Sequence, residues 1–176
     1  MPGRILVVHY SRSGHTKQLA EQIAQTVGAD LEAIVDPTDR SGLLGYLRSG
    51  YQAARQRTVG IGPAAHDPSA YDLVVIGTPI WNMSVSPPVR SYLARELGRL
   101  PRVAFFCTCG GSGGERAFAQ MARVCGKPPA ATLIVREAEL ARSGSAIARF
   151  SHDIAEAIRS VSPPAIAPQV GTPASR

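Results

Sequence analysis

Five short apolar runs alternate with segments of helical periodicity along this chain of 176 residues, and few folds satisfy such an alternation. The runs cover residues 4–9, 31–35, 72–77, 102–107 and 131–135. Their apolar residues are mostly continuous, which indicates strands in a sheet that helices cover on both faces. Strands that alternate with helices build a parallel sheet. We therefore predict one α/β, doubly wound domain over residues 1–162.

Apolar residues at helical spacing occupy the segments between these runs, and each stripe predicts a helix packed on the sheet. The stripes lie at 19–27, 89–97, 118–125 and 147–158. A further stripe predicts a helix near 42–56, inside a long connection between the second and third strands. The segment 163–176 is rich in proline and has no apolar periodicity, so we expect a mobile tail there.

The net charge of +6 comes mainly from arginine, and residues 40–66 contain four arginines and no acidic residue. A basic surface attracts nucleic acid, anionic lipid or an anionic cofactor. No nucleic-acid-binding motif accompanies these arginines, so we interpret the segment as a solvated helix face and expect no nucleic-acid partner.

The sequence also bears on compartment and metal binding. No apolar run approaches the roughly 20 residues that cross a bilayer. The first four residues lead directly into an apolar run without a signal segment. The three cysteines form no Cys-x-x-Cys pair, which argues against a disulfide framework and a zinc site. We expect a cytoplasmic protein with no membrane span and no metal.

Residues 10–16, Tyr-Ser-Arg-Ser-Gly-His-Thr, lie where the first strand ends and a helix is expected to begin. A helix N-terminus attracts anions, because unpaired N–H groups and the positive end of the helix dipole converge there. The hydroxyls of Ser11, Ser13 and Thr16 add donors, and Gly14 lets the backbone approach a bound oxygen. The segment predicts a phosphate monoester site, although such residues also serve as ordinary helix caps.

Two further loops follow strand ends. The loop at 77–88 contains the only tryptophan, Trp81, whose ring suits either stacking against a flat heterocycle or covering of a hydrophobic seam. Asn82 tolerates left-handed backbone that turns peptide groups toward a ligand. The loop at 107–114 is glycine-rich, which suits a close backbone approach to a flat ligand or a flexible connector. In a doubly wound fold both loops meet residues 10–16 at one edge of the sheet.

Together these loops resemble the flavodoxin-like family of FMN-binding proteins. Residues 11–16 match the family's phosphate loop, (S/T)-x-(S/T)-G-x-T, and residues 77–81 match the loop that places an aromatic residue against the isoalloxazine ring. Residues 107–114 stand where the family has its third flavin loop. The resemblance spans about residues 3–160. It implies a five-stranded parallel sheet of order 2-1-3-4-5 that binds FMN noncovalently.

The resemblance implies three groups of FMN-binding residues and no catalytic side chain, since the flavin carries the chemistry. The residues implied at the phosphate are Ser11, Ser13, Gly14, His15 and Thr16. As a separate hypothesis, we expect Arg12 and the basic helix to offset the phosphate charge or to receive the phosphate of NADPH. The group that lines the ring and its N5 edge comprises Thr78, Pro79, Ile80, Trp81, Asn82 and Met83. The group that approaches the pyrimidine end and the other face comprises Thr108, Cys109, Gly110, Gly111 and Gly113.

Two departures from the family pattern bear on function. Many electron-carrying flavodoxins are acidic and stack a second aromatic residue from the third loop, whereas this chain is basic and residues 107–114 contain no aromatic residue. An open flavin face favours an FMN-dependent oxidoreductase that passes electrons from NAD(P)H to a quinone-like or other small acceptor. The alternative is a flavodoxin-type carrier for a redox protein partner. The insert near 42–56 is a candidate lid or homodimer interface.

A third hypothesis is a serine hydrolase, since residues 110–114 satisfy Gly-x-Ser-x-Gly with Ser112 between a strand and a helix. The later histidine, His152, falls inside a predicted helix, and no convincing acidic residue precedes it on a strand-end loop. We interpret this match as a consequence of the glycine content of the loop.

Overall fold

The computed structural model describes residues 3–37 and 58–160. Its sheet contains five parallel strands, β1 (Ile5–His9), β2 (Asp30–Ala33), β3 (Leu73–Trp81), β5 (Arg102–Cys109) and β6 (Thr132–Arg136). Their order is β2-β1-β3-β5-β6, and the two-residue strand β4 (Ser84–Val85) pairs antiparallel with the end of β3. With β4 set apart, the observed order confirms the predicted 2-1-3-4-5.

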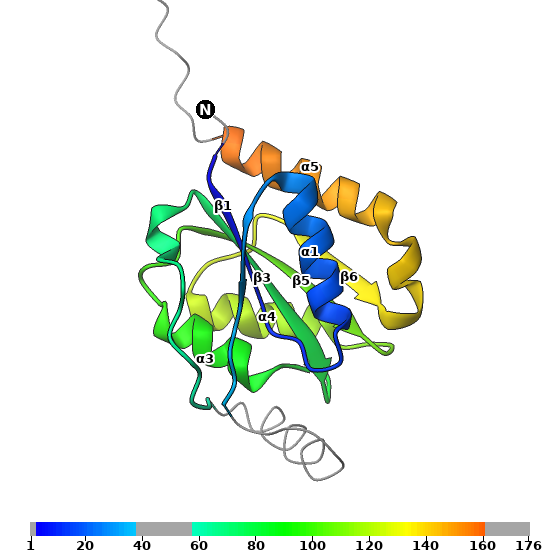
Figure 1. Ribbon diagram of the computed structural model, residues 1–176, viewed down its shortest axis with the longest axis horizontal. Helices are drawn as coiled ribbons and strands as arrows, with labels where there is room; N and C mark the ends of the chain where they lie inside the picture. The colour runs from blue at the N-terminus through cyan, green and yellow to red at the C-terminus, as the bar shows by residue number, and fades with distance from the viewer. Residues whose placement is uncertain (1–2, 38–57, 161–176) are drawn as a thin grey trace, which may run out of the picture.

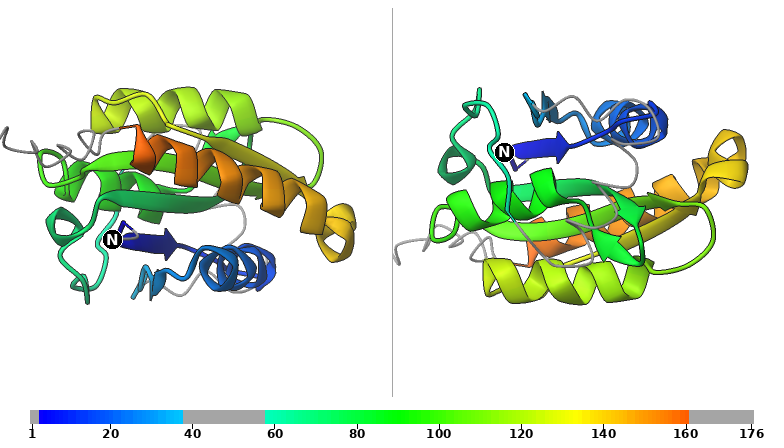
Figure 2. Two further views of the ribbon diagram at one scale, coloured as in Figure 1. Left: turned by 90° about the horizontal axis from the view of Figure 1, so that it is seen from above. Right: turned by 90° about the horizontal axis from the view of Figure 1, so that it is seen from below.

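Helices cover both faces of this sheet, as predicted for a doubly wound fold. The helices are α1 (His15–Val27), α3 (Pro87–Arg95), α4 (Gly114–Cys125) and α5 (Gly144–Arg159), with short 3-10 segments at Pro68–Ala70 and Glu137–Arg142. Figures 1 and 2 show α1 and α5 on one face and α3 and α4 on the other. Within the described residues, none of the helices is long and apolar enough to cross a membrane.

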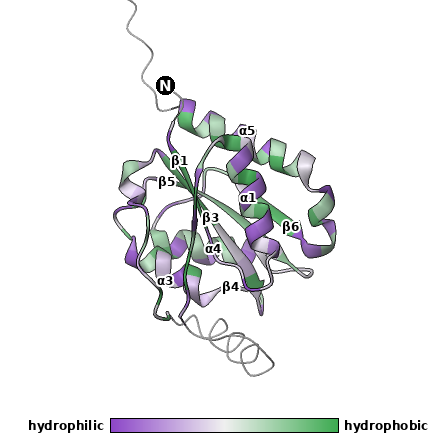
Figure 3. Ribbon diagram, in the orientation of Figure 1, coloured by the Kyte–Doolittle hydropathy of each residue, from purple (hydrophilic) through white to green (hydrophobic). Residues whose placement is uncertain are grey.

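Two hydrophobic clusters fill the spaces between the sheet and its helices. Successive side chains of a strand point to opposite faces, so Val7 packs with α1 and α5 while Val8 packs with α3 and α4. Figure 3 shows the resulting pattern of hydrophobic central strands and helices with one hydrophilic side. The continuous burial expected of all five strands holds for β1, for β3 as far as Pro79 and for nearly all of β5. It fails at both edge strands, since β2 is exposed except at Glu32 and burial alternates along β6.

Helix α3 ends earlier than the sequence predicted. The stripe 89–97 predicted that Leu97 would lie on a buried helix face, but α3 ends at Arg95 and Leu97 is 57% exposed. A turn follows the helix and includes Gly98 with a φ of 91°, a left-handed conformation that glycine adopts readily. The predicted helix near 42–56 and the tail at 163–176 lie outside the described residues.

Gly77 in β3 is required by the packing of its neighbour on β5. A Cβ atom at Gly77 would stand 2.0 Å from Cζ of Phe106, whose side chain is completely buried. We expect Gly77→Ala to lower the free energy of unfolding by about 1–3 kcal/mol, because the ring must shift within a dense core. Urea unfolding measures this change.

Gly60 supplies the control, since a Cβ atom there would meet no atom within 4 Å. Gly60→Ala is expected to change the free energy of unfolding by less than about 0.5 kcal/mol. Equal effects of the two substitutions would contradict the packing argument.

Candidate functional site

The register of the parallel strands brings three loops to one edge of the sheet. His9 of β1 is paired with Gly77 of β3, and Pro79 of β3 is paired with Thr108 of β5. The strand order reverses between β1 and β3, since β2 lies on one side of β1 and β3 on the other. Ligands of doubly wound folds bind beyond the carboxyl ends of strands at such a switch point. The residues predicted from the three loops therefore converge.

The first loop ends at an open helix N-terminus. Gly14 precedes α1 with a left-handed φ of 95°, no side chain of the described residues caps the helix, and its first turn contains no acidic residue. Ser11 Oγ accepts a hydrogen bond from the Gly14 N–H at 3.1 Å, which fixes the turn. Such an end suits an anion, because the helix dipole and backbone donors face it.

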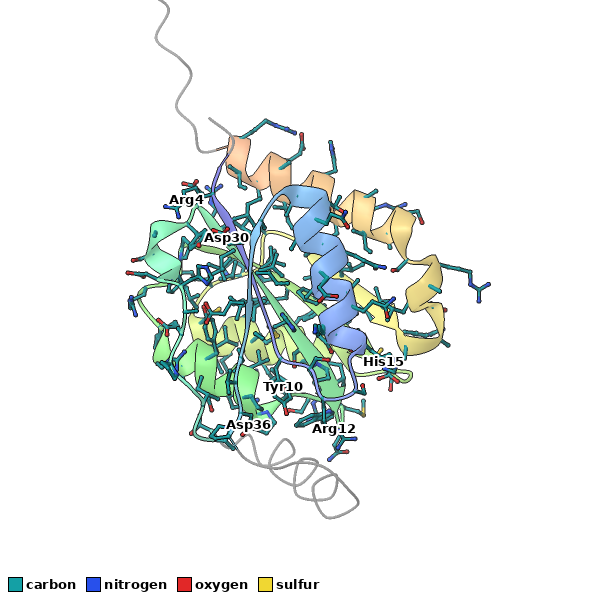
Figure 4. All side chains as sticks on the ribbon, viewed as in Figure 1. Arg4, Tyr10, Arg12, His15, Asp30 and Asp36 are labelled. Atoms are coloured by element: carbon teal, nitrogen blue, oxygen red, sulfur yellow. The ribbon has the colours of Figure 1, made fainter. Side chains whose placement is uncertain are left out.

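Charged side chains of both signs lie at this end of α1. Figure 4 shows Arg12 on the loop between β1 and α1 and His15 at the start of the helix. The Nδ1 atom of His15 lies 3.3 Å from Ser13 Oγ and 3.4 Å from a carboxylate oxygen of Glu137. Sequence reasoning missed Glu137, which reaches the loop from the segment after β6 and has no motif to identify it.

Thr16 and Thr108 connect the first and third loops. Their hydroxyl oxygens lie 2.7 Å apart, and both side chains are buried. The resemblance implied that Thr16 holds the phosphate and that Thr108 approaches the flavin, but in this structure the two hydroxyls bond each other. This bond joins residues 92 positions apart, so no local pattern could have predicted it.

The second loop is a tight hairpin between β3 and β4. Asn82 and Met83 have φ values of 47° and 56°, and Trp81 is paired with Ser84 across the turn. Two consecutive left-handed residues are typical of a type I′ turn. The left-handed conformation expected for Asn82 is confirmed, whereas that of Met83 was not foreseen. Left-handed backbone at a bulky residue costs on the order of 1–3 kcal/mol and persists only where its surroundings hold it.

The Trp81 ring lies against the first loop. It meets the Tyr10 ring edge-on, with centroids 5.7 Å apart and planes at 86°, and the guanidinium carbon of Arg12 is 5.9 Å from its centroid. Trp81 also packs on the core beneath α3 and α4. It therefore covers part of the hydrophobic core and lies against the loop that leads into α1, so both of the roles considered for it fit its position.

Glycines of the third loop have different surroundings. A Cβ atom at Gly110 or Gly111 would meet nothing within 4 Å, so both border open space. A Cβ atom at Gly113 would stand 2.7 Å from the Cα of Met83. The close approach that the glycine-rich sequence indicated is therefore made, at Gly113, to the hairpin of this same chain.

Several predicted site residues are buried beneath the loops. Thr78 is completely buried, and its Oγ1 lies 3.1 Å from both the N–H and the hydroxyl of Ser86. Pro79 and Cys109 are also buried, and burial raises the pKa of the Cys109 thiol. These residues support the loops from below, whereas Arg12, Ser13, Gly14, Asn82, Met83, Gly110 and Gly111 are exposed.

The serine hydrolase hypothesis finds no matching geometry among the described residues. Ser112 lies in the exposed third loop, and His152 lies on an exposed position of α5. No hydrogen bond joins the two side chains, which a nucleophile and its base require. Among the described residues there is also no cluster of three or more histidine, cysteine or acidic side chains that would hold a metal ion.

The site's sequence and fold identify its family. The family model for flavodoxin matches residues 4–133. This chain belongs to the flavodoxin family. The match covers all three loops and confirms the resemblance to flavodoxin-like FMN-binding proteins. No curated protein matches the sequence at a significant level.

Solved structures share the flavodoxin fold at low sequence identity. A flavoprotein from Lactobacillus acidophilus NCFM in complex with FMN is 22% identical, covers 80% of this chain and 97% of its own, and gives a TM-score of 0.67. A flavodoxin from the domain Archaea is 17% identical over 89% of this chain and 99% of its own, with a TM-score of 0.55. An NADH:FMN oxidoreductase in its apo form is 14% identical over 90% of each chain, with a TM-score of 0.50.

One buried histidine lies directly below the first loop. His9 ends β1 and is 3% exposed, and its Nδ1 has no hydrogen-bond partner. Burial lowers the pKa of His9 below its ordinary value of 6.5, while Glu21 and a backbone bond to Glu32 act in the opposite direction. The neutral ring therefore predominates in the folded protein near pH 7.

This lowered pKa predicts a loss of stability in mild acid. The unfolded chain takes up a proton at His9 below about pH 6.5, whereas the folded protein resists protonation, so the free energy of unfolding falls as the pH drops below this value. His9→Gln removes this component, and the exposed His152→Gln leaves it in place. Urea unfolding between pH 5 and 8 measures the dependence, and identical pH profiles for both variants would contradict it.

Proposed function

We propose that this chain binds FMN at the carboxyl ends of β1, β3 and β5. The observation that carries the proposal is the open N-terminus of α1 at Gly14, in the loop whose Arg12 lies over Trp81, at the switch point of a flavodoxin-family sheet. The residues fit the group, because a phosphate suits the helix end and a flat ring suits the tryptophan and the space beside Gly110. The flavoprotein from Lactobacillus acidophilus, with the same fold, is solved with FMN.

Different residues of the site would bind different parts of the cofactor. Backbone N–H groups at the start of α1 and the hydroxyl of Ser13 bind the phosphate, and Arg12 offsets its charge. Trp81 and the hairpin residues Asn82 and Met83 line the ring. Thr16 and Thr108 hold the first and third loops together from below.

We further propose that the protein is an oxidoreductase, in which NAD(P)H, a proton and a quinone-like acceptor give NAD(P)⁺ and the hydroquinone. FMN, when bound, supplies the hydride and electron transfer. The absence of an aromatic residue from 107–114 supports this function, because Gly110 and Gly111 border open space where a second aromatic ring would otherwise cover the flavin. One structure of the same fold is an NADH:FMN oxidoreductase.

The second candidate is a carrier that passes electrons to a redox protein. The family match to flavodoxin and the archaeal flavodoxin structure favour it. With a net charge of +6, this chain would require a partner with an acidic surface. A homodimer contact through the insert near 42–56 stays a prediction, since that segment lies outside the described residues.

Gly14→Val tests the phosphate site. A β-branched residue opposes the left-handed backbone at this position, so we expect FMN affinity to fall at least about tenfold. Gly28→Val is the matched control, because Gly28 is also left-handed, with a φ of 66°, but lies at the other end of α1. Titration of flavin fluorescence measures both. Equal affinity of the Gly14 variant and the wild type would remove this helix end from the site.

NAD(P)H oxidation distinguishes the two candidate functions. The FMN-loaded protein is mixed with NADH or NADPH, with and without a benzoquinone, and absorbance at the nicotinamide band is followed. The oxidoreductase is expected to consume the nucleotide at a rate that depends on the quinone. Absence of flavin reduction by either nucleotide would contradict this function and support the carrier.

A further inference from the structure

One buried side chain holds the hairpin that borders the candidate site. The side-chain oxygen of Gln120, on α4, accepts three hydrogen bonds, from Ser84 Oγ at 2.7 Å, from the Val85 N–H at 3.2 Å and from Arg90 Nη2 at 3.1 Å. Gln120 is 6% exposed, and all three bonds are buried. Ser84 and Val85 follow the hairpin residue Met83 directly.

Helix α4 contacts the hairpin at a second point. Gly113, which precedes α4, lies so close to Met83 that a Cβ atom would stand 2.7 Å from the Met83 Cα. Gly113 therefore packs against the left-handed residue Met83, and Gln120 bonds the two residues that follow it. A strained turn keeps a single conformation only when its surroundings determine it in this way.

The third bond to Gln120 brings a positive charge close to the hairpin. Arg90, on α3, is 6% exposed, and within the described residues it forms no ion pair with an acidic side chain. Its Nε has no hydrogen-bond partner. Burial and then the charge of Arg123 lower the pKa of Arg90. A buried charge without a counterion acts strongly on its surroundings, because little water screens it.

We propose that Gln120 and Arg90 form a positioning pair for the bound flavin. Gln120 fixes the peptide groups of the hairpin through Ser84 and Val85, and Arg90 adds a positive potential that favours the reduced, more negative form of FMN. This inference rests on the proposed FMN site and adds residues that touch neither substrate nor cofactor. Charge near the flavin is one of the means by which proteins tune its reduction potential.

Two substitutions separate geometry from charge. Gln120→Glu keeps an oxygen acceptor for the three donors and adds a negative charge beside Arg90. Gln120→Leu removes the acceptor and leaves the donors unpaired in the interior. The control is Gln25→Leu on an exposed position of α1.

Amide hydrogen exchange of the apoprotein tests whether Gln120 holds the hairpin in place. In Gln120→Leu the amide of Val85 is expected to exchange at least about tenfold faster than in the wild type, because its acceptor is missing. Gln120→Glu and Gln25→Leu are expected to retain the protection. Unchanged exchange at Val85 in Gln120→Leu would overturn the positioning role, whether or not FMN binds.

The midpoint potential of bound FMN tests the electrostatic effect of Arg90. Gln120→Glu and Arg90→Met are expected to shift it to more negative values, by about 30 mV for each tenfold loss in the preference for reduced over oxidised FMN in a two-electron couple. A wild-type potential in both variants would overturn the role of Arg90 alone. A wild-type protein that takes up no FMN would overturn the proposed function and with it this electrostatic role, while the exchange experiment still decides the positioning role.

Discussion

The parallel pairing of β1, β3 and β5 is the constraint on which the rest of the structure depends. Each strand must end at the same edge of the sheet, so three loops far apart in sequence meet there. The paired strands lie in a densely packed interior. Position 77 requires glycine, because the Phe106 ring occupies the space that a Cβ atom would take there. The candidate site is thus a consequence of strand register rather than of any single loop.

The loops differ in how they are held. The first ends in an uncapped helix N-terminus, which leaves backbone donors available to an anion. The second is a strained hairpin that needs support, and Gly113, just before α4, and Gln120, on α4, supply it. Thr16 and Thr108 fasten the first loop to the third. A site with a rigid base and exposed backbone at its rim suits a ligand with one charged end and one flat end.

Much of this could be predicted from the sequence, because local patterns determine it. Apolar runs located the five parallel strands, helical stripes located the four α-helices of the described residues, and the order of motifs indicated the family. Local patterns do not contain tertiary contacts, so the Thr16–Thr108 bond and the bonds of Gln120 were missed. The exposure of Leu97 was predicted wrongly, since periodicity continued past the end of α3. The conformation of Met83 depends on its neighbours, and its residue type alone would not indicate it.

Amide chemical shifts of the isotope-labelled apoprotein during titration with FMN test the central claim most directly. If the three strand ends build the site, one equivalent of FMN shifts amides of residues 11–16, 81–83 and 110–113, and leaves the opposite edge of the sheet unchanged. Shifts confined to other residues, or none at all, would contradict the account.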